Sequence, residues 1–570
     1  MAYYNGKKIL GFVIGGGGIA RELPTLFTPS IFVNSNGEII ITDERNGDFV
    51  SGYDIYMDDS LLATITGKIG NITDYIPIEE LRNKIYKVRA KSENFNDSDF
   101  SNEYILMSWT EGLKYTLSSD GTYYLCSGIG DATETDIIIR DDYDGLPVKA
   151  INTNAFYYND NVTSVTIPDS VTSIGSSAFN GCGELTSVRI GSNVKTIGNY
   201  AFYMCNKLRD ITIPDSVTNI AYNAFDDCDR LESVTIGKGV KNIGTDAFYS
   251  YSIKRVNYTG DIKGWCDITF TNAYSNPVYY ANGLYVNNEL VTELIIPDGV
   301  TSIRKYAFMC CDSLTSVNIP NSVTSIGEDA FYLCGSLTEI VIPDSVTSIG
   351  DRGFWGKNVT SIVVSENNQN YKSENDALYN KDGSELILYA CGKTANSFDI
   401  PSGVKTIKDS CFRGSNSLTR VTIPNSVTSI KKFAFGECDS LAEIVIPDSV
   451  TSIGEDAFYM SNGLRSITIP GSVTRLSNYM FYKCENLTSV IIEEGVETIS
   501  ESVFYYCNSL TSITIPNSLK TIGSYTFYGA TPLEIIYGGT ISQWNSITKR
   551  SSWRNRTIVV HCTDGDIQNA

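Results

Sequence analysis

The sequence predicts a mainly β protein, in which a small β-sandwich is followed by a long solenoid of 23-residue turns with short parallel strands. Three observations lead to this prediction. Phenylalanine recurs at 23-residue steps over most of the 570-residue chain. Each unit contains the LxxVxI spacing of a short strand with alternating inward side chains. Ahead of the array, residues 24–107 contain strand-like runs separated by polar turns, at about the spacing of a small sandwich.

Residues 1–23 form a glycine-rich N-terminal segment. Gly15-Gly16-Gly17-Gly18-Ile19-Ala20 fits the GxGxxA pattern of a dinucleotide site, and Asp43 follows the next strand-like run. However, Pro24 and Pro29 break the helix that such a site needs, and no further βαβ units follow. We therefore expect no cofactor, and a flexible linker in this segment.

The same segment is also similar to a secretory signal peptide, because Lys7-Lys8 precedes an apolar run. Four consecutive glycines make a poor apolar helix, and no clear A-x-A site follows. No stretch of the chain approaches the ~20 apolar residues of a membrane span, so we expect no membrane insertion.

The sandwich is predicted from strand-like runs at residues 38–42, 53–57, 61–66 and 86–90. The run from Leu81 through Tyr86 and Val88, followed by Ser98, resembles strand F and the next turn of a fibronectin type III domain. The tryptophan found early in that family is missing here. This resemblance implies a spacer or a binding module.

The array begins beyond residue 107 and is defined by its phenylalanines, which stand at positions 156, 179, 202, 225, 248, 308, 331, 354, 412, 435, 458, 481, 504 and 527. The two longer gaps, of 60 and 58 residues, predict insertions near residues 255–292 and 365–398.

Each part of the unit has a structural task. Leu185, Val188 and Ile190 mark the strand, Phe179 closes the turn, and Cys182 fills the remaining gap. One unit cannot bury its own apolar side chains, but stacked units bury them on their neighbours. This pattern predicts a solenoid.

Eight cysteines share one place in the unit, three residues after the phenylalanine: Cys182, Cys205, Cys228, Cys311, Cys334, Cys438, Cys484 and Cys507. Other units carry serine or alanine there, so the position favours a small, moderately apolar side chain, which predicts buried thiols. Stacked turns lie close enough for disulfides, so that alternative and the redox compartment stay open. No CxxC pair is present, which argues against a zinc ribbon.

The period, the IPxSVTSIG…AFxxC run and the leucine-rich start resemble the BspA-type bacterial leucine-rich repeat family over about residues 110–560. The resemblance implies an N-terminal cap at 108–150, leucine-rich repeats at 151–537 and a C-terminal cap at 538–570. It also implies that the two insertions are hairpin modules.

Composition excludes several kinds of chemistry. The 65 Asp and Glu against 44 Lys and Arg give a net charge of −21, which opposes binding to nucleic acid. His561 is the one histidine, so Ser/His/Asp and Cys/His catalysis are nearly eliminated. The pairs Glu328-Asp329 and Glu455-Asp456 fall in the same repeat position, where we expect a solvated turn. The aspartate clusters at 141–144 and 564–566 fit no EF-hand loop, so we expect neither a catalytic site nor a metal.

An aromatic residue follows the repeat phenylalanine in nine units: Tyr157, Tyr203, Tyr249, Tyr332, Trp355, Tyr459, Tyr482, Tyr505 and Tyr528. Because Ala, Phe and Cys take the inward face, we expect these rings along one exposed edge. Exposed tyrosines suit recognition of proteins or glycans. The alternative is a half-buried structural ladder, and the two are compatible.

The outward positions of the main strand are mostly small and polar. The charged departures from this pattern, besides Glu293, are Arg189, Asp210, Glu339, Arg420 and Glu443. If the strand face binds a partner, these charges are the candidates that set specificity.

We therefore predict a non-enzymatic adhesion or recognition protein that binds surface proteins or glycans through its solenoid. The family resemblance implies an extracellular or cell-surface location. Two alternatives remain: a phage tail or receptor-binding protein that reads the bacterial surface, and a purely structural scaffold. The ligand and the oligomeric state are not determined by the sequence.

Overall fold

The computed structural model describes residues 2–4, 7–9, 30–33, 38–42, 50–65, 69–71, 85–91, 98, 104–105, 109–530, 533–555 and 558–568. The glycine-rich motif at 15–20, Asp43 and the predicted domain boundary at 107/108 lie outside these residues. The chain divides into two compact units, Met1–Thr110 and Glu111–Ala570.

The described part of the first unit consists of short antiparallel strands. Its sheets follow the orders β1-β2, β3-β4-β7 and β6-β5-β8-β9. The strands are β1 (Ala2–Tyr4), β2 (Lys7–Ile9), β3 (Ser30–Val33), β4 (Glu38–Thr42), β5 (Gly52–Met57), β6 (Ser60–Ile65), β7 (Ile69–Asn71), β8 (Ile85–Lys91) and β9 (Tyr104–Ile105). All four strands predicted here are confirmed, and the small sheets are compatible with a sandwich. The fibronectin type III assignment stays a prediction.

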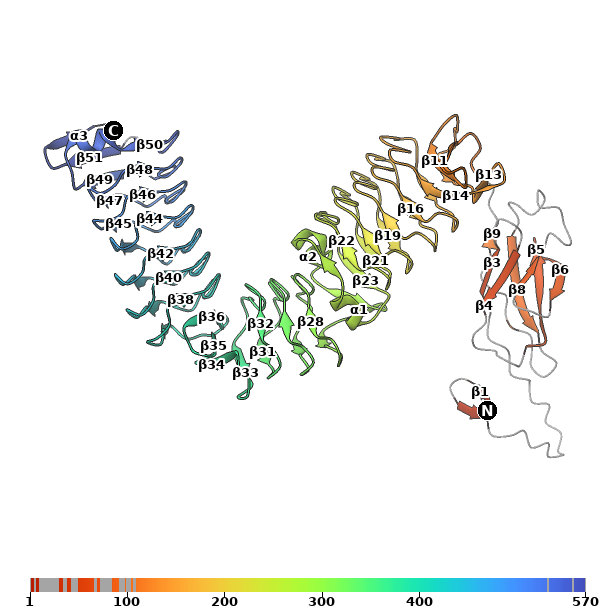
Figure 1. The fold of residues 1–570 in the computed structure, drawn as a ribbon, viewed down its shortest axis with the longest axis horizontal. Helices are drawn as coiled ribbons and strands as arrows, with labels where there is room; N and C mark the ends of the chain where they lie inside the picture. Colours follow the sequence, from red (N-terminus) through yellow and green to blue (C-terminus); the bar gives the residue numbers. More distant parts are fainter. Residues whose placement is uncertain are drawn as a thin grey trace. The chain divides into compact units, whose positions relative to one another are not determined.

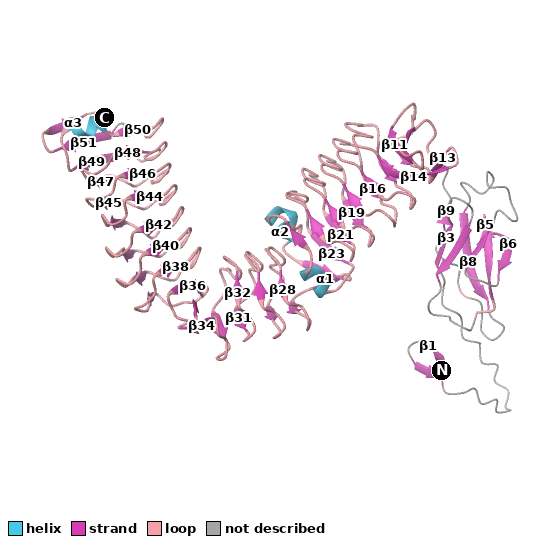
Figure 2. Cartoon of the chain, in the orientation of Figure 1, coloured by secondary structure: helices cyan, strands magenta, loops and turns pink. Residues whose placement is uncertain are grey.

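The second unit is a β-solenoid, and Figure 1 shows its turns stacked one after another from β11 to β51. Each regular turn contributes one longer strand and one two-residue strand, and corresponding strands of successive turns pair in parallel at a 23-residue offset, as in Val165↔Val188 and Ile174↔Ile197. Strands and loops make up nearly all of the unit (Figure 2). The mainly β solenoid predicted from the repeat is confirmed.

The longer strands form one face, which we name the long-strand face. They are β12 (Asp136–Ile138), β15 (Ser164–Thr166), β17 (Ser187–Arg189), β19 (Asp210–Ile213), β21 (Ser233–Ile236), β23 (Arg255–Tyr258), β25 (Leu284–Val286), β27 (Glu293–Ile295), β29 (Ser316–Asn318), β31 (Glu339–Ile342), β33 (Ser361–Val364), β37 (Ser397–Asp399), β39 (Arg420–Thr422), β41 (Glu443–Val445), β43 (Ser466–Ile469), β45 (Ser489–Ile492), β47 (Ser512–Ile515), β49 (Leu533–Tyr537) and β51 (Ile558–Cys562).

The shorter strands form a second face. They are β14 (Leu146–Ile151, the longest), β16 (Ser173–Ile174), β18 (Thr196–Ile197), β20 (Asn219–Ile220), β22 (Asn242–Ile243), β24 (Thr269–Phe270), β28 (Ser302–Ile303), β30 (Ser325–Ile326), β32 (Ser348–Ile349), β36 (Glu385–Tyr389), β38 (Thr406–Ile407), β40 (Ser429–Ile430), β42 (Ser452–Ile453), β44 (Arg475–Leu476), β46 (Thr498–Ile499), β48 (Thr521–Ile522) and β50 (Thr548–Lys549).

The third side of the turn is built around the repeat phenylalanine. In the turn of Phe458, the residues two before and two after the ring, Asp456 and Met460, have positive φ angles of 55° and 51°. These left-handed residues bend the chain so that Ala457 and Phe458 point inward, where both are fully buried. The Phe458 N–H donates to the Met480 carbonyl of the next turn at 2.9 Å, which offsets the strain of the bends.

The core of the solenoid is a stack of these rings. Within each block, successive phenylalanine centroids lie 5.0–5.6 Å apart with planes within 12° of parallel. Seven repeat cysteines donate their S–H to the phenylalanine carbonyl of the preceding turn, at 3.0–3.3 Å. Ser461 makes the same bond to the Phe435 carbonyl at 2.5 Å. The prediction that these cysteines fill the core is confirmed, and burial raises the pKa of Cys182 to about 12.

The first insertion contains more than the expected hairpin. It comprises α1 (Ile262–Cys266), β24, η4 (Ala273–Ser275), α2 (Val278–Ala281) and the antiparallel hairpin of β25 with β26 (Glu289–Leu290). Asp261 caps α1 by accepting from the Gly264 N–H at 2.7 Å. The predicted hairpin is therefore present in this insertion, and the short helices α1, η4 and α2 precede it.

The second insertion is the expected hairpin, formed by β34 (Tyr371–Glu374) and β35 (Ala377–Asn380), and β35 continues into β36. It interrupts the short-strand face, because β32 ends one sheet and the next sheet runs from β34 to β42.

Further elements cover the two ends of the solenoid. At the N-terminal end these are β10 (Lys114–Leu117), β11 (Tyr124–Gly128) and β13 (Asp142–Tyr143). At the C-terminal end they are α3 (Ile541–Ser546) and β52 (Gly565–Ile567). Thr540 and Gln543 form a capping box at the start of α3, which holds the buried Trp544.

The acidic pairs are not the solvated turns expected from the sequence. Asp329 and Asp456 are 3% and 9% exposed, because the left-handed backbone at each turns its side chain back against the solenoid. Asp329 accepts two hydrogen bonds from Arg352, at 2.8 and 2.6 Å, whereas Glu455 beside Asp456 is exposed as expected.

Candidate binding groove on the long-strand face

Each long strand presents two outward side chains, because the residues between them point into the core. In β41, Ile444 is buried while Glu443 and Val445 on either side are exposed. Parallel pairing in register places the same outward position of successive turns in a row across the face, as in Arg420↔Glu443. The face therefore carries two rows of outward residues.

The five predicted strand-face charges are all exposed on this face. Arg189, Asp210 and Glu339 lie on β17, β19 and β31. Arg420 and Glu443 are brought together as register neighbours of β39 and β41. The Arg420 guanidinium also lies 3.9 Å from the carboxylate of Asp399 on β37. This ion pair is exposed, so it contributes little to stability.

A groove of about 1070 Å³ runs along this part of the face, over β39, β41, β43 and β45. It is lined by the exposed side chains of Val445, Thr468 and Ile491. Val445 is 78% exposed. When a partner covers apolar groups in a hollow of this size, their removal from water makes the free energy of binding more favourable.

The aliphatic row was missed in the sequence analysis, which treated the outward positions as small and polar. Its members share the last outward position of the strand and are 44–78% exposed: Ile295, Val341, Val363, Val445, Ile491 and Ile536. The signal is present in the sequence, since units such as EIVIP replace the threonine of SVTIP with valine.

Acidic residues dominate the charge of the groove. Glu443, Asp448 and Glu493 line it and are exposed, against the single cation Arg420. Arg420 is itself beside Asp399. The groove thus combines aliphatic and hydroxyl groups with an excess of carboxylates.

The aromatic edge forms a structural ladder in the C-terminal block. Tyr459, Tyr482, Tyr505 and Tyr528 stack in parallel with centroids 5.5, 5.2 and 5.2 Å apart. All four rings are half-buried. This stacking corresponds to the ladder alternative, while a binding role for the row stays a prediction.

Trp355 departs from the expected exposed edge, because its side chain is fully buried. It stacks on Tyr332 at 5.0 Å, and its indole N–H donates to the Arg413 carbonyl at 3.1 Å. The expected exposure is therefore wrong for Trp355, since the turn that would follow it is replaced by the second insertion.

The other aromatic residues of the row have different surroundings. Tyr157 is 51% exposed. Tyr203 donates a hydrogen bond to Asp227 at 3.0 Å. Tyr249 belongs to a group of tyrosines in and beside the first insertion, and its hydroxyl lies 2.7 Å from that of Tyr251.

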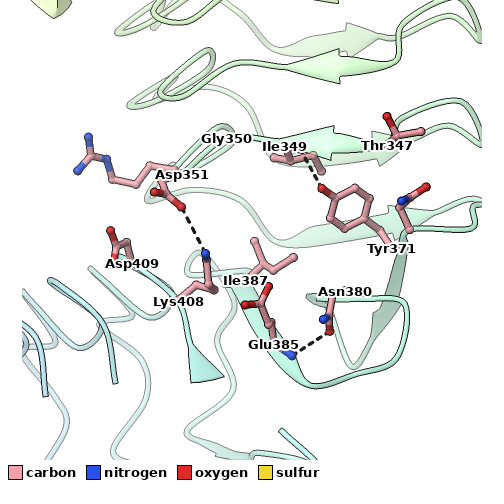
Figure 3. A pocket seen from close by; sticks show the side chains of 12 residues that line it. Thr347, Ile349, Gly350, Asp351, Tyr371, Asn380, Glu385, Ile387, Lys408 and Asp409 are labelled. Carbon is pink, nitrogen blue, oxygen red and sulfur yellow. Dashed lines mark hydrogen bonds and ion pairs between the residues drawn. The ribbon is translucent and has the colours of Figure 1, made fainter. Parts of the chain in front are cut away.

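A smaller hollow of about 160 Å³ lies at the second insertion (Figure 3). Its polar groups already have partners within the chain. The Lys408 ammonium lies 3.6 Å from the Asp351 carboxylate. The Tyr371 hydroxyl accepts a hydrogen bond at 2.9 Å from the N–H of Ile349, which belongs to β32, the last strand of its sheet. Burial, together with the charge of Asp351, raises the pKa of Asp409. This arrangement is a junction that closes the end of a sheet.

The described residues show no group of three or more His, Cys, Asp and Glu side chains placed to hold a metal ion. His561 pairs with Asp566 across the terminal hairpin of β51 and β52, at 2.9 Å. In the part of the chain that the structure describes, no helix is both long and apolar enough to span a bilayer.

Comparison with known proteins identifies the repeat. The sequence model of the BspA type leucine rich repeat region matches residues 149–276, 281–390, 384–508 and 428–550. A search of curated proteins finds no match.

Several solved structures are similar to this chain. A leucine rich cell surface protein from Faecalibacterium prausnitzii is 29% identical, with 78% of this chain and 98% of that chain covered and a TM-score of 0.44. A leucine-rich repeat protein from Eubacterium ventriosum is 25% identical, with 80% and 98% covered and a TM-score of 0.39. One from Bacteroides ovatus is 24% identical, with 72% and 94% covered and a TM-score of 0.39.

The matched segments of the family model span most of the second unit, and they contain the strands, the phenylalanine stack and the cysteine bonds described above. This protein belongs to the BspA-type leucine-rich repeat family.

Proposed function

We propose that this protein is a non-enzymatic recognition protein that binds another protein through the groove over β39–β45. The observation that carries the proposal is a groove of about 1070 Å³ that is lined by the exposed aliphatic side chains of Val445 and Ile491. A buried aliphatic anchor surrounded by polar groups is the usual composition of a protein interface.

The chemistry of the groove favours a polypeptide over a glycan. Val445 and Ile491 supply apolar contact, and the carboxylates of Glu443 and Glu493 attract basic side chains at the rim. The membership in the BspA-type family supports an adhesive role outside the cell. Repetition of the face over many turns also allows several weak contacts to be summed.

Binding of the labelled full-length chain to purified extracellular matrix proteins, intact bacterial cells and a glycan array would test this proposal. The double variant Val445→Ser/Ile491→Ser removes the exposed aliphatic side chains that line the groove, and we expect at least about a tenfold loss of affinity for the protein partner. Both side chains are exposed, so the solenoid should remain folded.

The matched control is Val341→Ser/Val363→Ser, which makes the same change at the same strand position outside the groove. Equal losses in the two double variants, or saturable binding to glycans alone, would contradict the groove as the site. Absence of saturable binding to every probe would instead support the scaffold alternative.

A further inference from the structure

After the second insertion, the long-strand face carries an exposed aliphatic side chain at every second turn. Val445 on β41, Ile491 on β45 and Ile536 on β49 are 78%, 48% and 49% exposed. The turns between them carry Thr468 on β43 and Thr514 on β47 at the same strand position. Strand pairing places Ile491 in register with both threonines. Ile536 is in register with Thr514, and we name these five positions the alternating row.

The spacing of the alternating row follows from the stacking of its turns. In the turns of β41, β43 and β45, the centroids of Phe458 and Phe481 lie 5.2 Å apart, and those of Phe481 and Phe504 lie 5.5 Å apart. Neighbouring strands themselves lie ~4.8 Å apart. Two turns therefore advance the face by about 10 Å, which is the distance between successive aliphatic residues of the row.

This distance matches the repeat of an α-helix that lies along the solenoid. Seven residues of helix rise about 10.5 Å over nearly two turns, so residues i and i+7 lie on one side. In an extended strand, residues three apart cover about 10 Å but face opposite sides. A polyproline helix repeats after about 9.3 Å, but such segments dock on aromatic side chains. Among the described residues that line the groove, none is aromatic.

Carboxylates lie on both sides of the alternating row. Glu443 and Glu534 occupy the other outward position of β41 and β49, and both are exposed. Asp448 and Glu493 are exposed beyond the opposite ends of β41 and β45. Arg465 directly precedes β43, but the five strands from β41 to β49 contain no lysine or arginine. The face therefore attracts basic side chains, and the net charge of −21 disfavours a second copy of this chain as the partner.

The turns before the second insertion carry a shorter version of the row. Ile295 on β27 and Val341 on β31 are exposed and also lie two turns apart. Val363 follows Val341 at the very next turn, on β33, and the second insertion then interrupts the repeats. This run has two aliphatic residues at the two-turn spacing, against three after the insertion, so it provides a matched control.

We propose that the long-strand face from β41 to β49 binds a basic amphipathic α-helix of a partner protein, which lies along the solenoid with an apolar residue at every seventh position. This inference rests on the proposed function and names the form of its partner. From Val445 to Ile536 the row spans about 20 Å, which corresponds to about 14 residues of helix. The residues i, i+7 and i+14 of the helix contact the three aliphatic side chains, and lysines or arginines beside them face the carboxylates.

The test is fluorescence anisotropy with labelled, stapled helical peptides of 21 residues added to the full-length protein. The first peptide has leucines at its positions 4, 11 and 18 and lysines on both sides of that stripe. The second has the same composition with leucines at positions 4, 9 and 14, which distributes them around the helix. The third has glutamates in place of the lysines. We expect the first to bind saturably, the second to bind at least about fivefold more weakly, and the third not to bind.

Variants of the protein locate the helix. Val445→Thr/Ile491→Thr/Ile536→Thr introduces the residue that intervening turns already carry at this position, so the solenoid should remain folded. We expect this variant to bind the first peptide at least about tenfold more weakly. The matched control, Ile295→Thr/Val341→Thr, makes the same change before the second insertion and should leave the affinity unchanged.

Three results would overturn the inference: equal affinity of the first and second peptides, wild-type affinity in the triple variant, or no saturable binding of any peptide. The proposed function is tested separately by the partner protein. If the peptides fail to bind but Val445→Ser/Ile491→Ser still loses the partner, the groove remains the site and the helix is wrong. If that variant also keeps the partner, the groove itself is wrong.

Discussion

Asp226 is a buried carboxyl group beside another buried polar residue of the same turn, Asn223. It is 8% exposed, and Asn223 donates a hydrogen bond to it. Burial, and then the charges of Asp227 and Asp246, raises the pKa of Asp226 to about 6. Because its pKa is higher in the folded than in the unfolded chain, the ionised carboxylate lowers stability above pH 6, and protonation restores that stability as the pH falls towards 4.

Asp226→Asn should therefore raise the free energy of unfolding at pH 7.5 by about 1–3 kcal/mol, because the pKa of about 6 lies above the ordinary aspartate value of 3.8. The gain should shrink towards zero at pH 4, where the wild-type carboxyl is protonated. Denaturant unfolding at both pH values measures this difference. Asp229→Asn, which removes the same charge from an exposed position in the same turn, should change stability little at either pH.

Single residues show which inward positions a repeat can predict. The burial of Phe179 and Cys182 follows from their recurrence, because a side chain that fills the same gap in every turn must be similar in each. The burial of Asp329 does not follow, since it depends on the left-handed backbone at that residue and on Arg352 one turn away. The sequence pattern likewise did not predict the hydrogen bond from the cysteine S–H to the phenylalanine carbonyl of the preceding turn.

At the scale of elements, two tryptophans complete the backbone hydrogen bonding that the insertions interrupt. In a regular turn the carbonyl before the phenylalanine accepts from the preceding turn, as Ala178 does from the Phe156 N–H at 2.7 Å. At the first insertion, the indole N–H of Trp265 donates to the Ala307 carbonyl instead, at 2.8 Å. At the second insertion the carbonyl before the phenylalanine, that of Cys411, accepts from the Tyr389 N–H at 3.0 Å. The indole N–H of Trp355 donates to the carbonyl after the phenylalanine, that of Arg413.

Trp265→Phe keeps an aromatic ring in the fully buried site but removes the indole N–H. We expect a loss of about 1–3 kcal/mol in the free energy of unfolding, from the missing hydrogen bond and the smaller ring. Hydrogen exchange should report faster opening around Ala307 than in the distant turns of Phe458. Unchanged stability and unchanged exchange would show that the indole N–H does not hold the insertion in place.

At the scale of the whole solenoid, side chains join the repeats on either side of the second insertion. Arg413 donates to the Tyr332 hydroxyl at 2.8 Å and to Glu437 at 3.1 Å. Its guanidinium also lies over Trp355 and Phe433, at 4.9 and 4.8 Å. In a repeat protein, cooperativity depends on such nearest-neighbour contacts, so Arg413 couples the two parts of the array.

Arg413→Met should weaken this coupling, because it leaves Glu437 with fewer partners and removes the contact to Tyr332. We expect the denaturant transition to broaden or to separate into two, with a lower apparent m-value. Arg420→Met is the matched control, since Arg420 is an exposed arginine of the following turn. A single transition of unchanged slope in the Arg413 variant would contradict the coupling role.

The solenoid, its period, most of its inward residues and the places of its two insertions could be predicted from the sequence. Periodicity is sufficient for this, because each turn repeats the burial of the turn before it. The stacking of the turns adds what the period cannot encode: the helices of the first insertion, the burial of Trp355 and the groove that Val445 of β41 and Ile491 of β45 line. These features depend on residues of different turns meeting across parallel strands, so they exist only once the turns are stacked.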